Sequence, residues 1–169
     1  MWHKDTKIMD IIIDIDERVA RARNYFTSGY NCAQAVAMAF DDVMTLDANT
    51  IARLSAPFGG GMGRMREVCG AVSGMTLVAG AICPSVDPKN MEERKANYAL
   101  VQHFAAEFRQ ENGDIVCRRL LGLEESVERS ESAMPSERTA EYYRKRPCVE
   151  YVATAARIVA THLATKEKE

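Results

Sequence analysis

The segment from Phe58 to Gly80 constrains the fold most, because a run of glycines leads into a stretch of small and apolar residues. The glycines at positions 59, 60, 61 and 63 allow positive φ angles and close approach of other groups to the backbone. The pattern then predicts a helix over residues 66–82. Each glycine in a helix interior costs about 1 kcal/mol relative to alanine. We therefore expect a central helix that other backbone segments approach closely on several sides.

Apolar residues in the rest of the chain recur at spacings of three and four, which is the pattern of amphipathic helices. Asn31 and Asp47 are suitable N-caps for two of these helices. The further predicted helices cover residues 5–26, 32–44, 47–57, 88–112, 114–122 and 136–146, and one begins at residue 148. No alternating strand pattern and no hairpin turn is present. The sequence therefore predicts an all-α, single-domain bundle of six to eight helices around the Gly/Ala-rich central helix.

The composition is that of a soluble globular protein, with 47% hydrophobic and 27% charged residues among 169. We expect one domain over residues 1–169, in which 1–18 form an N-terminal helical extension and the polar segment 124–136 a mobile loop. A net charge of −2 gives no bias toward nucleic acid or acidic lipid. The longest apolar stretch, residues 68–83, is shorter than the roughly 20 residues that span a bilayer. We expect a cytoplasmic protein that does not insert into membranes.

Four of the five cysteines are predicted near the start of a helix: Cys32, Cys69, Cys117 and Cys148. Unpaired amides and the macrodipole at a helix N-terminus stabilise an anion, and so favour the thiolate over the thiol. Arg64 and Arg66 add positive charge just before Cys69. We predict a four-cysteine site in which Cys69 is the nucleophile, because it has the most positive surroundings of the four.

The four cysteines are 37, 48 and 31 positions apart, so no CxxC pair is present. Any joint action requires that the fold bring them together. Cys83 differs from the four, because it precedes Pro84 at the end of a helix, where the dipole potential is negative. We expect Cys83 to be an ordinary thiol.

Four separated segments carry a resemblance to a known family. They are YNCAQAV (residues 30–36), FGGGMGRMREVCGAVSG (58–74), VCRRLLG (116–122) and PCVEYV (147–152). Together they resemble the C_GCAxxG_C_C family of redox-active proteins, whose pattern is a first cysteine, a Cys-Gly-Ala-x-x-Gly centre and two later cysteines. On this resemblance Cys32 is the first cysteine, Cys69 opens the centre, and Cys117 and Cys148 follow. Cys83 has no counterpart.

The resemblance implies a redox role but no defined reaction. Genes of the family commonly lie beside transporter genes, which implies association with a transporter. The family is also distantly similar to the split-Soret type of cytochrome c, in which a related helical domain carries haem. This chain has no CxxCH motif, so the resemblance does not extend to covalent attachment of c-type haem.

Four interpretations of the site remain open from the sequence. The first is reversible thiol–disulfide chemistry, in which any of the other three cysteines resolves Cys69. The second is a Cys₄ site that binds zinc or an iron–sulfur cluster for electron transfer. The third is a module that binds a small anionic ligand, or a glutathione-like thiol, through Gly59, Gly60, Gly61, Arg64 and Arg66. In the fourth, all five cysteines merely pack in the core.

These interpretations leave the cofactor open between none, zinc and an iron–sulfur cluster. The partner that we expect is a redox protein or a small thiol, neither of which the sequence identifies. The Gly/Ala-rich helix and the usual behaviour of helical bundles lead us to expect a homodimer.

Overall fold

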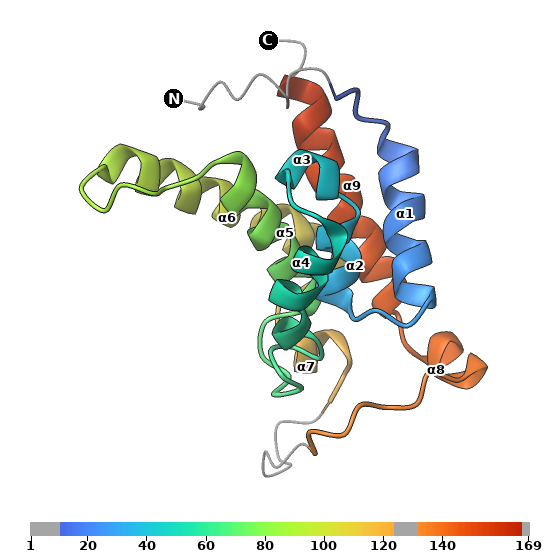
Figure 1. Ribbon diagram of the computed structural model, residues 1–169. Coiled ribbons are helices and arrows are strands. Elements are labelled where there is room, and N and C mark those ends of the chain that lie inside the picture. The colour runs from blue at the N-terminus through green and yellow to red at the C-terminus, as the bar shows by residue number, and fades with distance from the viewer. Residues whose placement is uncertain (1–10, 124–131, 167–169) are drawn as a thin grey trace.

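The computed structural model describes residues 11–123 and 132–166 (Figure 1). These residues form nine α-helices and one 3₁₀ turn, with no strand beyond an isolated bridge between Val68 and Val116. The helices are α1 (Ile15–Thr27), α2 (Cys32–Met38), α3 (Asp41–Met44), α4 (Ala48–Ser55), α5 (Gly70–Ile82), α6 (Met91–Asn112), α7 (Cys117–Leu120), α8 (Ala140–Lys145) and α9 (Cys148–Lys166), and the 3₁₀ turn η2 (Ala56–Phe58) follows α4. The predicted all-α class is confirmed.

The core lies where α1, α2, α5 and α9 pack together, with α6 closing one side. Figure 1 shows α1 and α9 side by side, whereas the α5–α6 connection and the first part of α6 project away from the bundle. Large buried side chains fill the interior, among them Phe26, Phe40, Met75, Phe104 and Phe108. In the described part of the chain, no helix has both the length and the apolar character needed to cross a bilayer.

The small residues of α5 allow α2 to approach it closely. A Cβ added to Gly74 would lie 2.7 Å from Val36 Cβ and 2.9 Å from the Ala33 carbonyl oxygen. Both distances are shorter than a carbon atom tolerates, so only glycine permits this contact between α2 and α5. The predicted close approach to the central helix is confirmed there. Gly80 in the same helix is different, because it is exposed with nothing within 4 Å of its added Cβ.

Several helices begin later than the sequence predicts. Helix α1 begins at Ile15, with Asp14 as N-cap, and the predicted first residues 5–10 lie outside the described residues. Helix α5 begins at Gly70 rather than at residue 66, because the preceding residues pair with a distant segment. Helix α6 begins at Met91, capped by Asn90, so Pro88 precedes the helix. The Asn31 cap is as predicted, and Gln34 completes a capping box with it.

The predicted helix over residues 32–44 is two helices, so the described residues form nine helices rather than the predicted six to eight. The break occurs at Ala39 and Phe40, where the Phe40 backbone leaves the helical region at φ −126°. The buried Arg18 of α1 donates from Nη1 to the Ala39 carbonyl oxygen (2.8 Å) and forms an ion pair with Asp42 (2.6 Å). This long-range partner satisfies a carbonyl that would otherwise lack one at the helix end.

The helix before α9 is shorter than predicted. Only Ala140–Lys145 of the predicted range 136–146 is helical, with the Thr139 side chain as its N-cap. Of the predicted mobile loop, residues 124–131 lie outside the described residues, and 132–136 form bends and extended chain.

Candidate functional site

The glycine loop between η2 and α5 has an unusual backbone. Gly60, Gly61 and Gly63 adopt positive φ angles, and so do Met62 (62°), Arg64 (63°) and Arg66 (59°). Non-glycine residues seldom adopt this region, and three in one loop indicate a backbone that its surroundings hold in place. The loop amides are bonded within the loop, for example Arg66 N to Gly60 O (3.2 Å). The loop therefore has a fixed conformation and lies beside the first turn of α5.

The end of this loop pairs with the segment before α7. The amide of Cys117 donates to the Glu67 carbonyl (2.6 Å), and the amide of Cys69 donates to the Ile115 carbonyl (2.8 Å). Because these bonds flank the antiparallel bridge between Val68 and Val116, Cys69 and Cys117 lie diagonally opposite each other on the same face. Residues 48 positions apart in the chain are thereby brought together.

The side chain of the buried Arg118 holds these two paired segments together. Its Nε donates to the Arg66 carbonyl oxygen (3.2 Å), and its Nη2 lies 2.6 Å from Glu67 Oε1. One guanidinium therefore satisfies a main-chain acceptor and a carboxylate of the opposite segment, as its rigid fork of donors permits.

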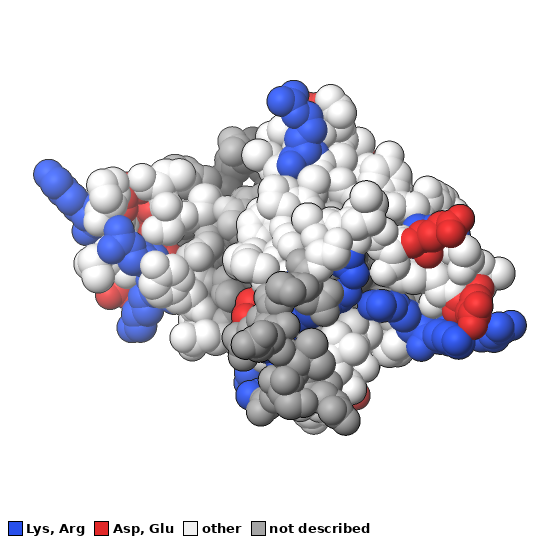
Figure 2. All heavy atoms as spheres, turned by 90° about the horizontal axis from the view of Figure 1, so that it is seen from below, with Lys and Arg blue, Asp and Glu red and all other residues white. Residues whose placement is uncertain are grey.

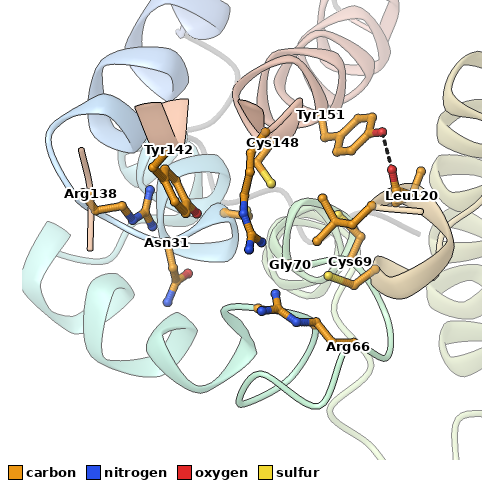
Figure 3. Close-up of a pocket in the computed structure, with 15 residues that line it drawn as sticks. Asn31, Arg66, Cys69, Gly70, Leu120, Arg138, Tyr142, Cys148 and Tyr151 are labelled. Carbon is orange, nitrogen blue, oxygen red and sulfur yellow. Dashed lines mark hydrogen bonds between the residues drawn. The ribbon is translucent and has the colours of Figure 1, made fainter. Parts of the chain in front are cut away.

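The four cysteines of the predicted site line one cavity of about 50 Å³ (Figure 3). Cys32, Cys117 and Cys148 are the first residues of α2, α7 and α9, and Cys69 is the N-cap of α5. Their predicted placement at helix starts is confirmed. Figure 3 shows Cys69 and Cys148 reaching the cavity from different sides, with Arg66 below it. Cys83 is the C-cap of α5 and is not in the lining.

Two of the cysteines pack closely against glycines, where a larger side chain would collide with them. A Cβ added to Gly61 would lie 2.6 Å from the Cys117 Cβ and 2.9 Å from the Glu67 amide nitrogen. A Cβ added to Gly70 would lie 3.0 Å from both the Cys32 Cβ and the Phe58 carbonyl oxygen. The second residue of the Cys-Gly-Ala centre is therefore glycine for a steric reason.

Cys148 has the most stabilised thiolate of the four. A hydrogen bond from the Cys32 thiol, with the positive charges of Arg146, Arg138 and Arg66, outweighs burial and lowers the pKa of Cys148 to about 7. The same hydrogen bond, together with burial, raises the pKa of Cys32 well above its usual value. When Cys148 is ionised, the two sulfurs therefore form a thiol–thiolate pair in which Cys32 donates and Cys148 accepts.

Cys69 has the opposite character. Burial raises the pKa of Cys69 to about 12, and hydrogen bonds from the Ala71 and Val72 amides offset this only in part. Burial also raises the pKa of Cys117, against a hydrogen bond and a positive charge from Arg66. The sequence predicts the most positive surroundings for Cys69, but Arg66 acts on Cys117 and Cys148, whereas desolvation dominates at Cys69.

The predicted Cys₄ metal site is not shown by the described residues. Throughout residues 11–123 and 132–166, no group of three or more His, Cys, Asp or Glu side chains is placed to hold a metal ion. A zinc or iron–sulfur site needs four ligand atoms that converge on one point.

The predicted anion-binding residues lie at and beside the cysteine cavity. Gly60, Gly61 and Arg66 line it, whereas Gly59 and Arg64 line a neighbouring cavity to which Gly60 and Arg66 also contribute. Sequence reasoning missed several further residues of the cysteine cavity, among them Arg138, Arg146 and Tyr151. Arg146 could have been found from its place two residues before Cys148. Tyr151 donates its hydroxyl to the Leu120 carbonyl (3.0 Å; Figure 3) and so links α9 to α7.

The fold and this cavity define an all-α protein in which four cysteines, three of them buried, line one cavity bordered by arginines. The family model described as "Putative redox-active protein (C_GCAxxG_C_C)" matches residues 30–162. The chain belongs to this family, as the four segments predict. The comparisons with curated proteins and with solved structures gave no match.

Proposed function

We propose that the protein catalyses thiol–disulfide exchange, with Cys148 as nucleophile and Cys32 as resolving cysteine. The observation that carries this proposal is that the hydrogen-bonded pair of Cys32 and Cys148 lies in one cavity with Arg66, Arg138 and Arg146, whose charges help to lower the pKa of Cys148 to about 7. An attacking thiol is most effective when its pKa is near the ambient pH, because about half of it is then ionised and the thiolate is still strongly nucleophilic.

The reaction has two steps. The Cys148 thiolate attacks one sulfur of a disulfide R–S–S–R′, so that a Cys148–S–S–R bond forms and R′–S⁻ leaves. Cys32 then attacks Cys148 Sγ, its proton passes to the departing R–S⁻, and a Cys32–Cys148 disulfide remains. The substrate gains two electrons and the cysteine pair loses two. A dithiol donor, of low molecular weight or protein, returns the two electrons and restores both thiols.

Cys69 and Cys117 complete the proposed site as a second dithiol. The charges of both Cys117 and Cys148 affect the pKa of Cys69, so the three sulfurs lie close enough to interact. In a second exchange, Cys69 and Cys117 would reduce the Cys32–Cys148 disulfide and become a disulfide themselves. Two electrons would then move from Cys69 and Cys117 to Cys32 and Cys148. The raised pKa of Cys69 and Cys117 keeps both residues mostly protonated at neutral pH, so they react more slowly than Cys148.

The experiment is to map the first disulfide that forms. Reduced protein is mixed with one equivalent of a small disulfide, quenched with acid, alkylated and digested for mass spectrometry. We expect a linked peptide pair that contains Cys32 and Cys148, in the wild type and in the control variant Cys83→Ser alike. Cys148→Ser should not form the link and should lose thiols at least tenfold more slowly. A first disulfide that omits Cys148 would overturn the proposal.

A further inference from the structure

A larger cavity of about 370 Å³ adjoins the cysteine cavity, and we call it the arginine cleft. The two cavities share six lining residues: Asn31, Gly60, Arg66, Arg138, Tyr142 and Arg146. A molecule in the arginine cleft would therefore lie directly beside Cys148. The volume is within the range of sites for small molecules.

The arginine cleft is positively charged. Four arginines line it, namely Arg64, Arg66, Arg138 and Arg146, and among the residues that the structure describes no aspartate or glutamate lines either cavity. Arg64 and Arg66 belong to the glycine loop, Arg138 lies just before α8, and Arg146 is the C-cap of α8. Figure 2 shows basic side chains in the middle of the lower face of the molecule, continuing toward one edge. A concave site with charges of one sign attracts and concentrates ions of the opposite sign.

The side chain of Arg138 is fixed by its neighbours, but one of its nitrogens has no hydrogen-bond acceptor among the described residues. Its guanidinium lies over the rings of Phe26 (4.7 Å) and Tyr142 (4.8 Å), and its Nη2 donates to the Tyr30 carbonyl oxygen (3.3 Å). Its Nη1 is buried, yet it has no hydrogen-bond acceptor among the described residues. A buried donor without an acceptor is unfavourable, and a bound carboxylate would supply two acceptors.

We infer that the arginine cleft binds the carboxylates of a small anionic disulfide and presents its sulfurs to Cys148. This inference rests on the proposed exchange reaction and names its substrate class. Arg64 lines the cleft but not the cysteine cavity, so it contacts the carboxylate-bearing end of the molecule. Arg138 and Arg146 lie at the boundary, where they both bind the anion and lower the pKa of Cys148.

The test compares two small aliphatic disulfides of opposite charge, glutathione disulfide and cystamine. The rate of thiol loss from the reduced protein is measured for the wild type, Arg64→Gln and the remote control Arg94→Gln. We expect Arg64→Gln to slow the reaction with glutathione disulfide about three- to tenfold and to leave cystamine unaffected. Arg94→Gln should change neither rate. An equal effect of Arg64→Gln on both disulfides would overturn the inference and leave the exchange reaction intact.

A binding measurement separates the cleft from the chemistry. S-methylglutathione carries the same carboxylates but cannot exchange, and calorimetry measures its affinity for Cys148→Ser. We expect binding that Arg64→Gln weakens several-fold and that rising salt weakens further. No binding would overturn the inference. Binding without reaction of either disulfide in the wild type would support the cleft and overturn the proposed function.

Discussion

At the residue scale, four cysteines in one cavity differ because their immediate neighbours differ. Cys148 accepts a hydrogen bond from Cys32 and lies near three guanidinium groups, whereas Cys69 is enclosed and receives only backbone amides. Charge and desolvation act in opposite directions on a thiol. The charges prevail at Cys148 and desolvation prevails at Cys69. Two predictions belong to this scale.

The first prediction concerns the charge beside Cys148. Arg146→Gln removes a cation that lowers the pKa of Cys148, so the pKa should rise. The rate of alkylation of Cys148 at pH 7 should fall about three- to fivefold, because a smaller fraction is ionised. The pH profile of Cys148 alkylation, followed by mass spectrometry, measures both. Arg144→Gln, two residues earlier and outside both cavity linings, is the control and should leave the profile unchanged.

The second prediction concerns stability at high pH. The pKa of Cys69 is about 12 in the folded protein and about 9 when unfolded, so above pH 9 the unfolded chain binds fewer protons. The free energy of unfolding therefore falls as pH rises from 9 toward 12. Between pH 8 and pH 10 the reduced wild type should lose about 1 kcal/mol more than Cys69→Ala, as urea denaturation would measure. An identical loss in both proteins would show that Cys69 ionises when folded.

At the element scale, the site depends on how closely α2 approaches α5, which places Cys32 beside the first turn of α5. The contact runs along Gly70 and Gly74, whose added Cβ atoms would meet Cys32 and Val36. Helix propensity favours alanine at both positions, so packing alone explains the glycines.

A matched pair of substitutions in α5 tests this packing. Gly74→Ala should destabilise the protein by about 2–3 kcal/mol, because the contact with the Ala33 carbonyl lies in the backbone and cannot move aside easily. Gly80→Ala should stabilise it by about 0.5–1 kcal/mol, because that site is open and alanine is the better helix former. Both values come from urea denaturation. If both variants were stabilised, α2 and α5 would not be in close contact.

The sequence predicts those elements that local patterns determine. The Asn31 and Asp47 caps and the start of α9 at Cys148 follow from residues within one turn of each boundary. The late start of α5 and the break after α2 depend on partners far away in the chain, namely residues 115–118 and Arg18. Arg138 was not predicted as a residue of the site for the same reason, because only the fold brings it near the cysteines.

At the scale of the whole molecule, the cavity is assembled from segments that span most of the chain. Helix starts at residues 32, 70, 117 and 148 meet there, and the pairing of residues 66–69 with 115–118 joins two of them. Arg118 links the two segments through a carbonyl and a carboxylate. The environment of Cys117 therefore depends on a long-range contact.

Two neighbouring arginines test this link. Arg118→Gln should cost about 2 kcal/mol, because it removes a buried hydrogen bond to the Arg66 carbonyl oxygen and the charged hydrogen bond to Glu67. It should also speed the alkylation of Cys117 several-fold, since the pairing that covers Cys117 loosens. Arg119→Gln removes a more exposed ion pair with Asp114 and should cost less than about 0.5 kcal/mol. Equal costs would show that Arg118 does not hold the two segments together.

The most direct test of the account is the order in which the four cysteines of the cavity react. Reduced protein is treated without oxygen at pH 7.5 with a limiting amount of iodoacetamide, and each site is quantified by mass spectrometry over time. The account predicts that Cys148 is alkylated first and well ahead of Cys69, because their pKa values are about 7 and about 12. Alkylation of Cys69 ahead of Cys148 would contradict it.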